Sequence, residues 1–306
     1  MASQLAPLLP SSLLHLALTT LIPYPPSQPL DFSLIRRTFF HGSTSSFPPT
    51  LITQSWALLR TLHTLGLDNI PALLSFLPSP SSADFPLLAL GMQLLLDQMP
   101  RRLLKGLNQR WTNAYFDSIS LRLAKSLLSL PDTDKPRSWS RWKDTVSLDY
   151  WILVRAWFGT PFVHSDSPES QSLAAEFTNE TRLVVEQITG TVDPYRQQRD
   201  VLLKDIYAFP RVIRADPKPE EETKEGFAYW MCMLMDVHKP IVDAFGHYPY
   251  RNVFFGREDT EEEMEWFRRT GDFGRPKEEV RKLLGEDVKE GRLRGLEVPG
   301  VLEIGE

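Results

Sequence analysis

Apolar residues recur three or four positions apart along most of the chain, which is the spacing of a helix with one buried face. The clearest example is segment 221–246, EETKEGFAYWMCMLMDVHKPIVDAFG, whose apolar stripe from Phe227 to Phe245 predicts a helix. Segment 86–99, PLLALGMQLLLDQM, is apolar nearly all round and predicts a buried helix. Because no stretch of useful length alternates between polar and apolar residues, the pattern indicates an all-α protein.

Clusters of proline, serine and glycine separate the helical segments. No internal repeat of fixed period is visible, so any repeat architecture is degenerate. We expect one helical domain of antiparallel helix pairs over residues 1–270, and then a charged, loosely packed tail over 271–306 with one short helix. Further helices are predicted at 50–67, 110–130, 137–159 and 167–190, and after Thr260, which stands at capping-box spacing from Glu263.

The composition is that of an ordinary globular protein, with 42% hydrophobic and 24% charged residues among 306. A net charge of −5 argues against a broad nucleic-acid footprint, and against DNA, but leaves room for a local basic patch. A single cysteine, Cys232, excludes an internal disulfide and points to a reducing compartment. The first segment lacks the basic start and cleavage site of a signal peptide, and no apolar stretch is long enough to span a bilayer. We therefore expect a cytoplasmic protein without membrane contact.

Charged residues surround Pro100 in the segment LLLDQMPRRLLKG. We expect Pro100 to separate two helices, so that Asp97 lies in the last turn of one helix, and Arg101 and Arg102 lie in the first turn of the next. Both placements oppose the helix dipole and cost about 0.3–1 kcal/mol each. Two interpretations are open: Asp97 pairs with an arginine to hold the corner, or the group binds an anionic or polar ligand at the helix start.

Two histidines are candidates for proton transfer. His164 follows an apolar run and precedes a helix capped by Ser167, while Asp166 is of a type that either caps a helix or contacts a ligand. His238 lies on the apolar stripe, so it is either a core residue satisfied by one hydrogen bond or part of a site. The six histidines show no His-x-x-x-His spacing and there is no cysteine pair, so we expect no metal.

The segment 246–258, GHYPYRNVFFGRE, shows neither helical nor strand periodicity. It combines a histidine, four further aromatic residues, two arginines, an asparagine and two glycines. Arginine has the fork geometry that suits a carboxylate or phosphate. We expect this segment to fold over the inner ends of the helices that carry Asp97, His164 and His238, so that its arginine and asparagine groups line a polar pocket. The candidate ligand-binding residues of this segment are His247, Arg251, Asn252 and Arg257.

Three blocks of the sequence resemble the family catalogued as domain of unknown function 924. They are LLLDQMPRRLLKG, PFVHSDSPESQ and FGHYPYRNVFFGREDTEEE, in that order. The resemblance covers about residues 87–267 and implies a TPR-like helical fold. Three positions depart from the family pattern: Val163 and Asp166 stand where the family usually has glutamate, and Tyr250 stands where it has histidine. These departures weaken any metal site that would rely on the missing groups.

A looser similarity connects these blocks to fungal arginine-containing cyclodipeptide synthases. It implies an enzyme of secondary metabolism that joins two aminoacyl groups carried on tRNA, with no cofactor. His164 or His238 would take the amine proton, and Asp97 would hold an imidazole or the incoming ammonium. Arg101 would bind substrate, together with Asp166, His247, Arg251, Asn252 and Arg257. The run RRLLKGLNQR would offer cations to the tRNA backbone.

The alternative is a noncatalytic TPR-like scaffold that binds a peptide or protein partner. In that case the three blocks only hold helix corners together, and His164→Ala and Arg251→Ala would change stability alone. A metal hydrolase is a weaker third interpretation. The sequence leaves open the second amino acid, the oligomeric state and which histidine is the base.

Overall fold

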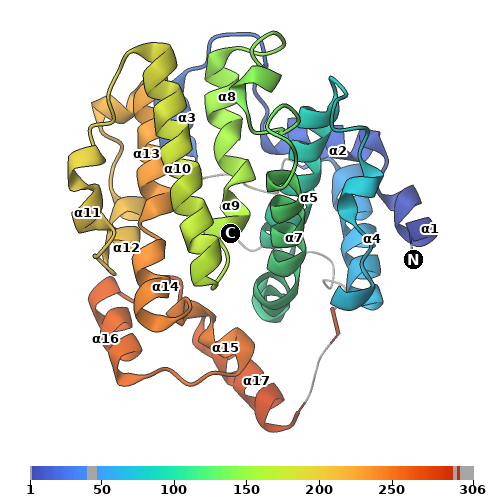
Figure 1. Cartoon of the computed structure of the whole chain (residues 1–306). Helices are drawn as coiled ribbons and strands as arrows, with labels where there is room; N and C mark the ends of the chain where they lie inside the picture. Colours follow the sequence, from blue (N-terminus) through green and yellow to red (C-terminus); the bar gives the residue numbers. More distant parts are fainter. Residues whose placement is uncertain (1, 40–46, 292–294, 297–306) are drawn as a thin grey trace.

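The structure is a computed structural model that describes residues 2–39, 47–291 and 295–296. Within these ranges every regular element is a helix, which confirms the all-α class (Figure 1). The TPR-like arrangement of helix pairs stays a prediction. No helix in the described part of the chain is long and apolar enough to cross a membrane. The longer helices are α2 (Ser11–Leu21), α4 (Pro49–Leu65), α5 (Phe85–Leu103), α7 (Asp117–Leu128), α8 (Leu148–Arg155), α10 (Pro168–Thr189), α13 (Lys224–Asp236), α16 (Glu261–Thr270) and α17 (Glu278–Lys289).

Helix α5 forms the centre of one half of the molecule, where it packs against α2, α4 and α7. Its residues are buried on every side, as the all-round apolar segment predicts. At Gly91 the two helices α5 and α2 come so close that a Cβ atom would lie 2.3 Å from the backbone oxygen of Leu14. Glycine is therefore needed at this crossing for steric reasons.

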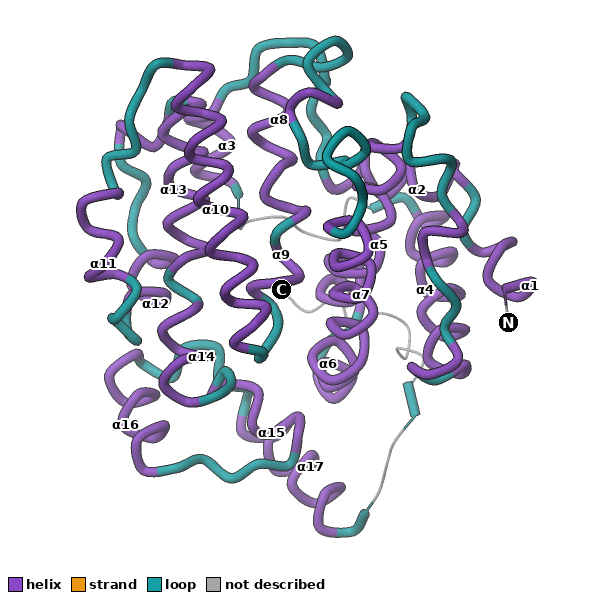
Figure 2. Tube along the Cα trace, viewed as in Figure 1, coloured by secondary structure: helices purple, strands orange, loops and turns teal. Residues whose placement is uncertain are grey.

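The other half is formed by α8, α10 and α13 together with shorter helices (Figure 2). Helix α10 packs along α13 and also contacts α9. Four helices, α14–α17, lie across the lower end of both halves in Figure 1. The shorter helices are α1 (Ala2–Leu5), α3 (Phe32–Thr38), α6 (Gln109–Trp111), α9 (Thr160–Val163), α11 (Arg199–Leu202), α12 (Ala208–Arg214), α14 (Lys239–Phe245) and α15 (Asn252–Phe255).

Pro100 does not end a helix, contrary to the prediction. Helix α5 continues through it to Leu103, so Arg101 and Arg102 lie in a last turn. Cations are favoured there by the helix dipole, and the expected dipole penalty is absent. The proline removes one backbone donor, yet its own carbonyl still accepts a hydrogen bond from Leu104 N at 2.8 Å.

Segment 221–246 forms two helices and not the single helix that its stripe predicts. Helix α13 ends at Asp236, and α14 begins at Lys239 after His238. Pro240 stands at the second position of α14, where it has no backbone N–H to continue the ladder of α13. His238 lies at this break and is still buried, as its place on the stripe predicts.

Two other segments differ from the prediction. In 137–159 the helix begins only at Leu148, because the side chain of Ser147 caps it by accepting from Tyr150 N. In the segment expected to be a loose tail, α17 contacts α15 and the turn Gly106–Asn108. It buries Leu284 and Asp287 there. The tail helix is thus packed against the body of the protein.

Candidate functional site

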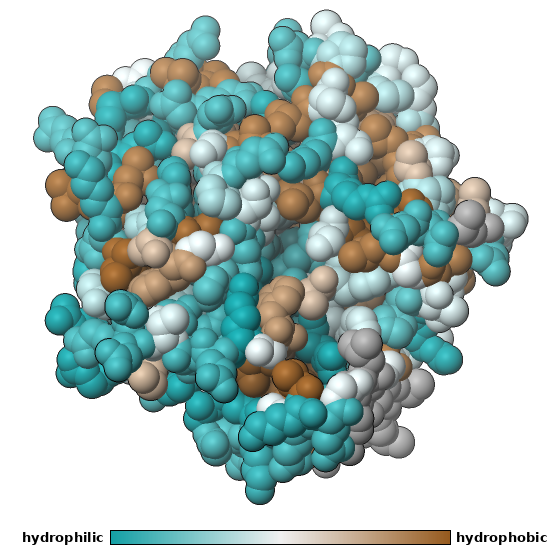
Figure 3. Space-filling model, turned by 60° about the horizontal axis from the view of Figure 1, so that its bottom comes forward, coloured by the Kyte–Doolittle hydropathy of each residue, from teal (hydrophilic) through white to brown (hydrophobic). Residues whose placement is uncertain are grey.

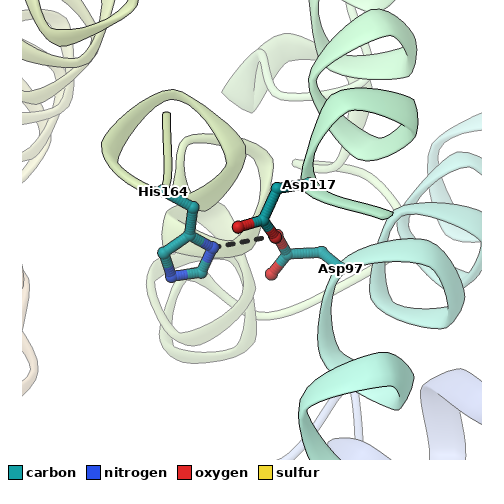
Figure 4. A group of neighbouring side chains, drawn as sticks. All are labelled: Asp97, Asp117 and His164. Atoms are coloured by element: carbon teal, nitrogen blue, oxygen red, sulfur yellow. Dashed lines mark hydrogen bonds and ion pairs between the residues drawn. The ribbon is translucent and has the colours of Figure 1, made fainter. Parts of the chain in front are cut away.

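Three segments that are distant in the sequence meet near the lower end of α5. Asp97 projects from α5, Asp117 begins α7, and His164 follows α9 directly (Figure 4). Arg251, from the short turn before α15, reaches the same place, since its Nη1 donates to the backbone oxygen of His164 at 2.7 Å. The predicted convergence of the three blocks is therefore present in the fold.

Asp97 is 1% exposed and holds the centre of this group. Its Oδ1 lies 2.9 Å from His164 Nδ1 and accepts from Ser120 Oγ at 3.2 Å. Gln98 Nε2 and Thr160 Oγ1 donate to its other oxygen. Burial by itself would raise the pKa of Asp97, but the charges of His164 and Arg101 and these hydrogen bonds hold that pKa well below its ordinary value.

Asp117 was not among the predicted site residues. Its carboxylate lies 2.7 Å from Arg101 Nη2 and 3.4 Å from Arg251 Nη2. Burial raises the pKa of Asp117 above its ordinary value, and the two arginines oppose this rise. One sequence signal could have found this residue, because Asp117 is the only acid between Asp97 and Asp132 in a run rich in cations.

Arg251 is 4% exposed and links Asp117 to a second carboxylate, because its Nη1 lies 3.1 Å from Asp166 Oδ1. Asp166 Oδ2 in turn lies 3.6 Å from Arg257 Nη2. Charges of opposite sign therefore alternate over five residues, which we call the ion-pair chain. Its members in spatial order are Arg101, Asp117, Arg251, Asp166 and Arg257.

His164 borders a cavity of about 330 Å³, which we call the His164 cavity. Its Nδ1 faces Asp97, while Nε2 points away from both carboxylates (Figure 4). The rest of the wall combines cations, polar groups and a large apolar surface. These lining residues are Phe39, Gln98, Arg101, Arg102, Trp157, Thr160, Val163, Phe209, Ile213, Met231, Leu234, Met235 and His238.

His238 borders the same cavity, but a backbone oxygen and not a carboxylate holds its ring. Its Nδ1 lies 2.8 Å from the backbone oxygen of Leu234, which can only accept, so Nδ1 carries the proton and Nε2 the lone pair. The ring packs against Phe209 at 3.9 Å between centroids. Burial, helped by the charges of His164 and Arg251, lowers the pKa of His238 to about 3. His238 is therefore a neutral acceptor at physiological pH.

The structure places His247 and Asn252 away from this cavity. His247 Nε2 lies 2.7 Å from Glu263 Oε1, and Asn252 Nδ2 donates to Asp259 at 3.1 Å and to the other oxygen of Glu263 at 3.0 Å. Arg251 and Arg257 do not line this cavity either. The expectation that the arginine and asparagine groups of this segment would line the pocket is therefore wrong. Glu263 is also the capping-box acid of α16, so its carboxylate is held at the start of that helix, where both side chains contact it.

Asp97, Asp117 and His164 are of the types that bind divalent metals, and one potential ligand atom of each lies within 4.8 Å of the others. However, Arg101 and Arg251 already neutralise Asp117, and His164 Nδ1 is engaged by Asp97. A metal ion would add two positive charges to a balanced cluster and displace Arg101. The side chains present therefore fit an ion-paired site better than a metal centre.

The fold and the site together define a helical protein in which a carboxylate orients a histidine toward a largely apolar cavity. The family described as "Bacterial protein of unknown function (DUF924)" matches residues 79–271. This match covers more than half of the chain, so the protein belongs to that family. No curated protein and no solved structure matches the chain.

Proposed function

We propose that the protein is a tRNA-dependent arginine-containing cyclodipeptide synthase of secondary metabolism. In this reaction the amine of one aminoacyl group attacks the ester carbon of the other, which forms a dipeptidyl-tRNA and releases the first tRNA. The free amine of the dipeptide then attacks the remaining ester, which closes the ring and releases the second tRNA. In each step the amine loses a proton and the departing tRNA oxygen gains one. One observation carries the proposal: His164 lines a cavity, Asp97 holds its Nδ1, and its Nε2 points away from both carboxylates. We also propose that the helices of this all-α fold are arranged in antiparallel pairs as in TPR proteins.

The Asp97–His164 pair suits a general base. A carboxylate at Nδ1 fixes the tautomer that leaves a lone pair on Nε2, and it stabilises the imidazolium formed when Nε2 takes a proton. Asp97 stays ionised because its pKa is held below the ordinary range. It is itself held by Ser120 Oγ, which accepts in turn from Gln93 Nε2 at 2.9 Å. His164 is therefore prepared for proton transfer before a substrate enters.

The room around His164 suits a reaction between two acyl groups. A second cavity of about 280 Å³ shares Phe39, Gln98, Arg102 and Trp157 with the His164 cavity. Two aminoacyl side chains could occupy adjoining spaces, with the reacting atoms near their shared wall. Positioning of this kind supplies much of the acceleration in an aminolysis that uses activated esters.

The cations at the end of α5 suit the phosphates of a tRNA acceptor end. Arg101 and Arg102 line the His164 cavity, and Lys105 Nζ donates to the backbone oxygen of Arg101 at 2.9 Å. Burial and the charge of Arg102 lower the pKa of Lys105. A phosphate bound there would relieve this repulsion between like charges. The arginyl identity of one substrate rests on the family resemblance, because Asp97 and Asp166 are already paired.

The test is expression of the chain in a heterologous host, followed by mass spectrometry of new small molecules and a reconstituted assay with charged tRNA. We expect a cyclodipeptide that contains arginine. His164→Ala should fold and lose product, whereas His15→Ala, at an exposed position of α2, should retain it. Failure of the wild-type chain to release any cyclodipeptide would refute the reaction, and full activity of folded His164→Ala would refute the site.

One observation favours the noncatalytic alternative. An open groove of about 760 Å³ is lined by Tyr207 and Phe245 and by glutamates at the start of α16. Acidic and aromatic groups together suit a basic, apolar peptide. A scaffold would bind such a peptide saturably in a fluorescence-anisotropy titration, would lose binding with Glu262→Lys, and would give no product with charged tRNA.

A further inference from the structure

A second charged cavity lies beneath α15, and it is separate from the His164 cavity. It measures about 320 Å³ and has three arginines from three segments in its wall: Arg257 after α15, Arg275 after α16, and Arg281 in α17. Apolar residues such as Pro249 and Phe267 complete the wall. We call it the Arg257 groove. The lower face of the molecule, which comes forward in Figure 3, is largely hydrophilic and is hollowed near its middle.

Arg275 and Arg281 are each paired with carboxylates of their own surroundings. Arg275 Nη2 lies 2.8 Å from Asp259 Oδ2, and its Nη1 lies 3.1 Å from Asp272 Oδ1. Arg281 pairs with Glu278 in the first turn of α17. These contacts hold the two guanidinium groups at the edge of the groove.

Arg257 is different, because its guanidinium donates no hydrogen bond to any described residue. Among the described residues its one ionic contact is with Asp166 at 3.6 Å, and its face packs over Phe255 at 4.8 Å. The side chain is 34% exposed, while Nε and Nη2 are buried without a partner. Nη1 is therefore the nitrogen that can reach a ligand in the groove.

The ion-pair chain explains why the positive charge of Arg257 is only partly neutralised. Asp166 is shared with Arg251, which is closer to it at 3.1 Å, so Arg257 receives only part of one carboxylate. The chain contains three arginines and two aspartates and ends in a cation at the groove. Glu258 and Asp259 also line the groove, so its formal charge is three positive against two negative. An anion beside Arg257 would complete the alternation of charge.

We propose that the Arg257 groove binds a phosphate group, with Arg257 Nη1 as the main donor. Guanidinium groups converging from three segments match the several oxygens of a phosphate, whereas a single carboxylate would use only one of them. The phosphate comes either from a small phosphorylated molecule or from the backbone of RNA. This inference does not depend on the proposed synthase activity.

The experiment is isothermal titration calorimetry of the full chain at low salt, with pyrophosphate and a four-nucleotide single-stranded RNA as separate probes. We expect saturable binding of one probe per chain. Arg257→Gln should weaken binding about tenfold or more, because a charge-assisted donor is lost, and Arg281→Gln should weaken it by a smaller factor. Tight pyrophosphate binding would indicate a small-molecule source, and preference for the oligonucleotide would indicate RNA.

Arg268→Gln is the matched control, because Arg268 is an arginine of the neighbouring α16 that is 71% exposed and lies outside the groove lining. It should leave affinity unchanged. Circular dichroism checks folding, which Arg257→Gln should preserve because that side chain makes no hydrogen bond. The proposal is refuted if the wild-type chain binds neither probe saturably, if Arg257→Gln binds as tightly as wild type, or if Arg268→Gln weakens binding equally.

Discussion

One cluster of buried charge joins the two halves of this protein and borders a cavity, and another lies within one half and lines none of the cavities described above. The first is the Asp97–His164 pair with the ion-pair chain beside it. The second, which we call the Arg182 cluster, joins α10 to α13. Arg182 Nε lies 2.5 Å from Asp193 Oδ2, and Arg182 Nη2 lies 2.9 Å from Asp236 Oδ2. Arg199 Nε lies 2.8 Å from the same Asp236 oxygen. Arg182, Asp193 and Asp236 are each almost fully buried.

The difference lies in whether the cluster has a titratable group at a cavity. In the Arg182 cluster the remaining acceptors of the aspartates are taken by local donors, since Thr178 Oγ1 donates to Asp236 at 2.5 Å and Tyr195 N donates to Asp193 at 2.8 Å. None of these groups lines a cavity named above. Beside Asp97, by contrast, His164 lines a cavity, and its Nε2 points away from both carboxylates. Buried charge alone thus does not mark a site, whereas a fixed titratable group with a free atom does.

The largest expected effect is on stability, at the Arg182 cluster. Arg182→Met would leave Asp193 and Asp236 buried with reduced compensation, and we expect a loss of about 3–5 kcal/mol in the free energy of unfolding. Urea denaturation followed by circular dichroism measures it. Arg196→Met, which removes an exposed pair with Glu186, should cost less than about 1 kcal/mol. Equal costs for the two variants would contradict the structural assignment of the cluster.

The next effect is on activity, at the other cluster. Asp97→Asn preserves size but removes the charge that orients His164, so product formation from charged tRNA should fall by about 10²-fold or more. Asp84→Asn, at an exposed position before α5, serves as the control and should retain full rate. If Asp97→Asn kept the rate but lost stability, Asp97 would belong with Asp193 and Asp236 as a structural group.

A smaller effect concerns pH, because the two carboxylates of the site are shifted in opposite directions. The pKa of Asp97 is depressed, so its contribution to stability is present above the unfolded value of about 4 and is lost as pH falls below it. The pKa of Asp117 is raised, so wild type should gain stability relative to Asp117→Asn as pH falls toward 4. Urea midpoints measured between about pH 3 and about pH 7 compare Asp97→Asn and Asp117→Asn with wild type. Parallel curves would contradict the opposite shifts.

The smallest effect comes from His238. With a pKa of about 3 in the folded state it stays neutral, while the unfolded chain takes up a proton below about pH 6.5. Wild type should therefore lose about 1.4 kcal/mol of stability by about pH 5.5 from this residue, and His238→Asn should remove that loss. Proton NMR of the imidazole offers a direct check: the His238 resonance should not move between about pH 8 and pH 5.

Helical spacing predicted the elements whose stability comes from one buried face, and the motif order predicted that Asp97, His164 and Arg251 would meet. The failures have local physical causes. At Pro100 tertiary packing of an apolar helix outweighs one lost hydrogen bond, so the helix continues. Asp117 was missed because its importance comes from Arg101 and Arg251, and the latter lies 134 positions away along the chain. Asn252 was misplaced because a capping glutamate, and not the pocket, satisfies its amide.

The π-helical stretch Thr112–Phe116, directly before α7, has a consequence for how the sequence can change. A π-turn holds one more residue than an α-turn, and such turns often accompany functional sites. Deleting one residue there would let a regular helix form, but the residue meeting Arg101 would be rotated by about 100°. Chains of this family that lack one position before the acid should therefore have lost the carboxylate that Arg101 and Arg251 share, even where every other motif is intact.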